Sequence, residues 1–102
     1  EKAVIQKLMN YPNPFNSQTT ISFEHNQPNT QLPVEVGIFA TNGQLVKTIR
    51  KTVFTAGTRN CEIQWDGTDE NGQKLKKAIY IYRVVITLGE QKFVSAGQMI
   101  LY

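Results

Sequence analysis

The chain has 102 residues, a formal net charge of +3 and one cysteine, which fits one domain with a single core and excludes an internal disulfide. Its basic residues are scattered, apart from Lys74, Lys76 and Lys77, so no basic stripe of a nucleic-acid-binding surface is visible. No run approaches the roughly 18 apolar residues of a membrane span, and the start at Glu1 instead of Met indicates a fragment of a longer protein.

Residues 1–7 are predicted to form a linker from an upstream domain, and residues 8–102 to form the domain itself. A first short strand is expected around Leu8–Tyr11. The prolines of the following Tyr11-Pro12-Asn13-Pro14-Phe15-Asn16 fix φ and remove two backbone donors, so this segment is expected to be turn or polyproline-like. Phe15 is predicted to fill the open end of a sandwich.

Alternation of apolar and polar residues predicts the next strand over Thr19–Glu24, with Ile21 and Phe23 facing inward. His25, the single histidine, follows at the end of this strand. A lone histidine in a polar connection is expected at the surface, because acid–base and metal chemistry both need partner residues.

Val34–Ala40 alternates again and is followed by Asn42-Gly43, the strongest short hairpin signal. Leu45–Lys51 is predicted to be the return strand of this hairpin. Thr55–Thr58 is predicted to turn the chain toward the next strand.

The segment from Cys61 to Ile86 is predicted to be the centre of the fold. Cys61–Trp65 has the period of a half-buried strand, and Ala78–Ile86 is rich in β-branched and aromatic residues. The Asp-, Asn- and Gly-rich residues between them favour a turn. We therefore expect the two strands to form a central hairpin around Trp65.

The last strand is predicted over Lys92–Tyr102, with Gly97 marking a bulge or a close backbone approach. About seven strands with turn signals every 8–12 residues predict an all-β fold, an immunoglobulin-like sandwich of antiparallel strands.

No catalytic constellation is apparent. Cys61 and His25 are the only candidates for a nucleophile–base pair, and Cys61 faces the core in the predicted strand. No cofactor is predicted. Asp66 and Asp69, with their neighbours Glu70 and Asn71, offer oxygens for calcium. Their spacing is not that of an EF-hand, so a turn is the favoured interpretation and a weak calcium site the alternative.

Both faces of the strand over residues 79–86 are largely apolar. Either the strand is covered on both sides or one face meets a partner. The alternative to a partner surface is that Arg83 only lays its stem over neighbouring residues while its charged head stays in water. The chain ends in Met99-Ile100-Leu101-Tyr102, which is expected to be a core strand or, alternatively, a strand that pairs with another protein.

Taken as an ordered set, several motifs resemble the C-terminal sorting domain of type IX secretion cargo. The same set is similar to the immunoglobulin-like domain of the flagellar hook-capping protein. The motifs are Asn10-Tyr11-Pro12-Asn13-Pro14-Phe15-Asn16, Thr19-Thr20-Ile21-Ser22-Phe23, Val36-Gly37-Ile38-Phe39, Asn42-Gly43-Gln44-Leu45-Val46-Lys47-Thr48-Ile49, Trp65-Asp66-Gly67-Thr68-Asp69 with Gly72, and Tyr80-Ile81-Tyr82-Arg83-Val84. The details Phe23-Glu24-His25-Asn26 and Trp65–Asp69 look most like the end of the sortase of that secretion system.

The resemblance implies a non-enzymatic domain that serves as a secretion signal. Such a domain crosses the periplasm of a Bacteroidetes-type bacterium, passes through the type IX translocon and docks on the outer-membrane shuttle barrel PorV at the cell surface, without inserting into the membrane itself. The family's recognition elements fall on the last strands. They imply a partner-binding set of Tyr80, Ile81, Tyr82, Arg83, Gly97, Gln98, Met99, Ile100, Leu101 and Tyr102.

Two departures from the family pattern matter. Ala78 stands where glycine is usual, and the end of the chain has Gln98 and Tyr102 where lysines are usual. Both fit a member that is retained on the surface better than cargo that is cleaved. A sortase's cysteine-protease chemistry would then lie upstream of this fragment. The alternative function is a structural assembly module of the hook-capping type.

Overall fold

A computed structural model describes residues 4–102, which contain seven β-strands and no helix. The strands are β1 (Gln6–Tyr11), β2 (Thr19–Glu24), β3 (Gln31–Ala40), β4 (Leu45–Phe54), β5 (Asn60–Trp65), β6 (Ala78–Leu88) and β7 (Gln91–Leu101). The all-β class and the seven antiparallel strands predicted from the sequence are confirmed.

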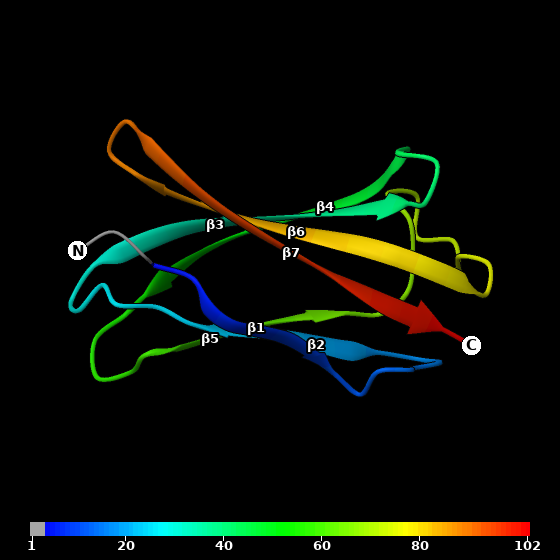
Figure 1. The fold of residues 1–102 in the computed structure, drawn as a ribbon, viewed down its shortest axis with the longest axis horizontal. Helices are drawn as coiled ribbons and strands as arrows, with labels where there is room; N and C mark the ends of the chain where they lie inside the picture. Colours follow the sequence, from blue (N-terminus) through cyan, green and yellow to red (C-terminus); the bar gives the residue numbers. More distant parts are fainter. Residues whose placement is uncertain (1–3) are drawn as a thin grey trace.

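The strands form two layers, seen edge-on in Figure 1. One sheet has the order β1-β2-β5 and the other has the order β4-β3-β6-β7. Neighbouring strands within each sheet are antiparallel. β6 is thus a central strand, as predicted, and β7 forms one edge of the four-stranded sheet.

The predicted hairpin of Cys61–Trp65 with Ala78–Ile86 is wrong. β5 pairs with β2, whereas β6 pairs with β3 and β7 in the opposite sheet. Residues 66–77 carry the chain from one layer to the other, at the end of the sandwich where the C-terminus lies (Figure 1). This connection folds on itself, because Asp69 N–H donates to the Gln73 carbonyl at 2.9 Å and Leu75 N–H to the Gly67 carbonyl at 3.0 Å.

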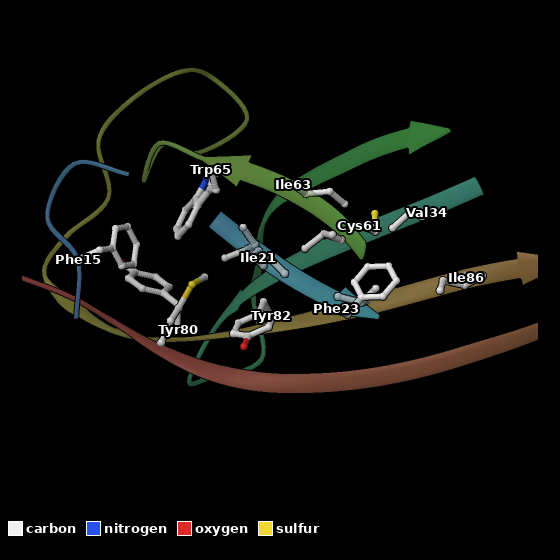
Figure 2. Packing of buried hydrophobic residues seen from close by; sticks show 14 of the residues in the cluster. Phe15, Ile21, Phe23, Val34, Cys61, Ile63, Trp65, Tyr80, Tyr82 and Ile86 are labelled. Carbon is white, nitrogen blue, oxygen red and sulfur yellow. The ribbon is translucent and has the colours of Figure 1, made fainter. Parts of the chain in front are cut away.

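The core lies between the two layers and follows the period of two that the sequence shows (Figure 2). Ile21 and Phe23 of β2 are fully buried, as predicted. The other buried apolar residues of the strands are Leu32, Val34, Val36 and Ile38 of β3, Cys61, Ile63 and Trp65 of β5, Tyr80, Tyr82, Val84 and Ile86 of β6, and Met99 and Leu101 of β7.

An aromatic cluster closes one end of the core. Phe15 is 1% exposed and lies with its ring centroid 5.6 Å from that of Trp65. Tyr80 packs edge-on against Trp65 at 6.2 Å, and the indole N–H donates to the Thr68 carbonyl at 3.0 Å. Figure 2 shows the three rings side by side. The prediction that Phe15 fills the end of the sandwich is confirmed.

The predicted Asn-Gly turn joins β3 to β4. Gly43 has φ of +92°, a conformation that glycine adopts without steric cost. β3 begins at Gln31, earlier than the predicted Val34, and includes Pro33. Pro33 pairs with Thr52 of β4, while the pairing of β3 with β6 starts only at Val34.

The first strand begins at Gln6, two residues before the predicted Leu8, and Val4 is packed in the core at 2% exposure. Of the linker predicted for residues 1–7, residues 1–3 lie outside the described residues. Connection to an upstream domain stays a prediction.

Candidate functional site

The predicted partner-binding residues lie on two adjacent strands, β6 and β7, except for Tyr102, which directly follows β7. The antiparallel register places Tyr80 opposite Met99, Ile81 opposite Gln98, and Tyr82 opposite Gly97. Residues from the two strands of this hairpin thus form one continuous area next to the C-terminus.

These residues divide between the two faces of the sheet. Tyr80, Tyr82, Met99 and Leu101 are buried in the core, each at 4% exposure or less. Arg83, Gln98, Ile100 and Tyr102 are exposed and Ile81 is half-buried. A rigid partner can therefore contact only the second group, while the first group holds the two strands in place.

At Gly97 the side chain of Tyr82 lies close to the backbone of β7, and the β6–β7 register has no bulge there. A Cβ at this position would lie 2.6 Å from the Tyr82 hydroxyl oxygen and 2.7 Å from its Cζ. The Tyr82 ring therefore covers the backbone of β7, which only glycine permits without displacement of the ring. Burial raises the pKa of the Tyr82 hydroxyl, which keeps it protonated.

The free edge of β7 is occupied next to the C-terminus. Asn13 accepts the Ile100 N–H at 2.9 Å with Oδ1 and donates from Nδ2 to the Gln98 carbonyl at 3.3 Å. Phe15 continues the contact, because its N–H donates to the Ile100 carbonyl at 2.9 Å and its carbonyl accepts the Tyr102 N–H at 2.8 Å. A partner that adds a strand here would have to displace residues 13–15.

No pattern in the sequence places Asn13 in this area. The two prolines that flank Asn13 indicated a turn, but they gave no sign of which strand its side chain would reach. The contact spans more than 80 positions of sequence, 85 for Gln98 and 87 for Ile100.

Arg83 also has a defined environment. Its guanidinium carbon lies 5.2 Å from the centroid of the Phe39 ring, within the range of a cation–π contact. Phe39 stands opposite Ile81 on the neighbouring strand β3. The sequence predicted an aliphatic stem over neighbouring residues with the charged head in water, whereas here the guanidinium itself lies over the Phe39 ring.

His25 was expected at the surface, and this prediction is wrong. It is 2% exposed, and within residues 4–102 its Nε2 is the one buried side-chain nitrogen or oxygen without a hydrogen-bond partner. His25 continues the inward alternation of Ile21 and Phe23, which is the sequence signal that was missed. Burial, and secondarily the charge of Arg59, lowers the pKa of the imidazole.

Cys61 faces the core opposite Phe23 of β2, and His25 follows Phe23 by two residues, directly after the end of β2. Burial raises the pKa of the Cys61 thiol, which disfavours the thiolate that nucleophilic chemistry needs.

The acidic residues of the β5–β6 connection are used in turns. Asp66 accepts the Thr68 hydroxyl at 2.6 Å, and this bond is the main cause of its lowered pKa. Asp69 accepts the N–H groups of Asn71 and Gln73 at 2.9 and 3.0 Å. Among the described residues no group of three or more His, Cys, Asp or Glu could hold a metal ion. The turn interpretation therefore accounts for both aspartates.

Within residues 4–102 no helix is long and apolar enough to span a membrane.

Comparisons with known proteins agree with the fold. The sequence profile of the FlgD Ig-like domain matches residues 10–90. Among curated proteins none matches this chain. In solved structures the chain is similar to part of PorU from Porphyromonas gingivalis, which is described as dimeric and latent. The identity is 30% and the TM-score 0.83, over 92% of this chain and 9% of that one.

A second solved structure gives a more distant likeness. PorZ from Porphyromonas gingivalis is described as an essential bacterial surface component of the type IX secretion system. It matches with 18% identity and a TM-score of 0.56, over 94% of this chain and 11% of that one. At this identity the likeness concerns the fold. The chain spans about a tenth of the length of either structure.

Proposed function

The chain belongs to the family of FlgD Ig-like domains, and on that premise we propose that it is a C-terminal signal domain of the type IX secretion system. In this role it directs its parent protein to the bacterial cell surface and tethers it to the outer-membrane barrel PorV. The parent is a sortase of the PorU kind, with its catalytic residues outside this domain. The observation that carries the proposal is the 30% identity to PorU over 92% of this chain.

The geometry fits a sorting signal that a partner protein recognises better than it fits an active site. The exposed residues of the proposed partner-binding set share one area on β6 and β7, beside the C-terminus. The likeness to PorU and PorZ favours secretion over the hook-capping alternative. Retention of the domain on the surface fits the residues Gln98 and Tyr102, which stand where cleaved cargo usually has lysine.

Deletion of Gln98–Tyr102 would be a poor test, because it removes Met99 and Leu101 from the core. A better pair is Ile100→Ser and Val94→Ser. Both side chains are exposed on β7, at 43% and 58%, and they lie about 20 Å apart at 3.3 Å per strand residue. Val94 is outside the proposed set and is the matched control.

Both variants are introduced into the full-length parent protein in cells. We expect Ile100→Ser to reduce both surface delivery and co-purification with PorV, while Val94→Ser leaves both unchanged. Equal behaviour of the two variants would contradict the site. A wild-type chain that reaches the surface without binding PorV would contradict the tethering role.

A further inference from the structure

The outer face of the four-stranded sheet, which points away from the other layer, carries exposed apolar side chains near the C-terminus. Leu45, Ile79 and Ile100 are 51%, 45% and 43% exposed. The register places Ile79 opposite Ile100 and Phe39 opposite both Leu45 and Ile81. These five residues form an apolar patch that crosses all four strands. Exposed patches of this kind are typical of interaction sites.

Arg83 lies at the margin of this patch, between two positions with small residues. Its partners across the sheet are Gly37 on β3 and Ala96 on β7, which have small side chains or none. A Cβ at Gly37 would lie 2.9 Å from Cε1 of Phe39, so the Phe39 ring rests on the Gly37 backbone. Arg83 in turn lies over that ring. The glycine thus makes room for the Phe39 ring on which Arg83 stacks.

A shallow open groove of about 250 Å³ lies between Arg83 and the β3–β4 turn. Its lining includes Phe39, Ile81, Arg83 and Ala96. The groove is therefore apolar along its floor and positively charged at one side.

Arg83 has no acidic partner within the described residues. The ion pairs among residues 4–102 are Lys7 with Glu24 at 3.6 Å and Arg50 with Glu35 at 3.7 Å. Arg50 is on the same sheet, opposite Glu35 on β3, so its charge is already balanced. The charge of Arg83 has no such balancing partner. A guanidinium held over an aromatic ring is well placed to bind a carboxylate.

We propose that this groove binds a carboxylate of the partner protein, an Asp or Glu side chain flanked by apolar side chains. The carboxylate pairs with Arg83, and the apolar neighbours cover Phe39, Ile81 and Ile100. This inference rests on the proposed function and names the chemistry of the partner surface. Charge complementarity argues for this occupant, because an apolar partner without an acid would leave the guanidinium desolvated and unpaired.

The test uses the full-length parent protein and purified PorV in detergent, with binding measured by biolayer interferometry at low and high NaCl. We compare Arg83→Gln with Arg50→Gln, which removes the same charge from the same sheet. We expect Arg83→Gln to weaken binding about tenfold and Arg50→Gln to change it less than about twofold. The wild-type affinity should fall with salt more steeply than that of Arg83→Gln. Melting curves of both variants are recorded as a control for folding.

Equal affinities of the two variants would overturn the carboxylate site and leave the proposed function standing. A wild-type protein that does not bind PorV would overturn both. Vesicles with and without phosphatidylglycerol, and sedimentation of the protein alone, test the other occupants. If Arg83→Gln abolishes vesicle binding or self-association instead of PorV binding, the groove serves an anionic lipid or a second copy, and the inference is wrong.

Discussion

Phe15→Ala is expected to destabilise the domain severely. Phe15 is 1% exposed and packs against Trp65 in the aromatic cluster that closes the sandwich. Truncation of a buried Phe to Ala costs about 3–5 kcal/mol, a large part of the roughly 5–15 kcal/mol that holds a domain together. At about 4–8 °C per kcal/mol for a domain of this size, the midpoint of thermal unfolding should fall by more than about 12 °C.

The matched control is Phe54→Ala, the same chemical change at a side chain that is 61% exposed. Its effect should stay within about 0.5 kcal/mol. Unfolding is followed by circular dichroism and by the fluorescence of Trp65, the single tryptophan, which lies next to Phe15. If Phe15→Ala lowers the free energy of unfolding no more than Phe54→Ala does, the packing of Phe15 at the aromatic end of the core is refuted.

Three further predictions concern single residues. Asn13→Ala should cost about 1–2 kcal/mol through two lost hydrogen bonds and speed amide exchange at Ile100; unchanged exchange would contradict the contact. Gly97→Ala should cost about 1–3 kcal/mol in urea unfolding, because the new Cβ meets Tyr82, and a neutral change would count against it. For His25, whose pKa is lowered in the fold, the unfolded chain takes up the proton first as pH falls below about 6.5. Stability should therefore decrease from pH 7.5 to 5.5, and His25→Gln should make this decrease smaller; an unaltered pH dependence would exclude His25 as its cause.

Much of the fold follows from local pattern. The alternation in Thr19–Glu24 and Cys61–Trp65 located β2 and β5 and named their inward residues. Asn42-Gly43 located a hairpin, because this dipeptide favours the positive φ that a tight turn requires. These features depend on residues a few positions apart, so a single sequence contains them.

The errors concern strand pairing and contacts between residues far apart in sequence, which the local pattern of residues does not determine. The turn-rich residues 66–77 predict a change of direction, but they do not say whether the next strand joins the same sheet or the opposite one. Their crossing between layers depends on the pairing of β6 with β3, which lies far away in sequence. The contact of Asn13 with β7 and the stacking of Arg83 on Phe39 are non-local in the same way.

The residues of the proposed site were named from a family resemblance, without knowledge of their orientation. The structure divides them into a buried group around Tyr82 and an exposed group around Ile100. It also shows that the edge next to the C-terminus is occupied by Asn13 and Phe15. These two facts support our proposal that a partner is recognised through side chains of the outer face instead of by strand addition at this edge.

The most direct test places a photo-crosslinking amino acid at position 100 or at position 94 of the full-length parent protein in cells. We expect irradiation to link position 100, but not position 94, to PorV. A crosslink from position 94 alone, or none from either position while PorV is present, would contradict the claim that the barrel contacts the outer face beside the C-terminus.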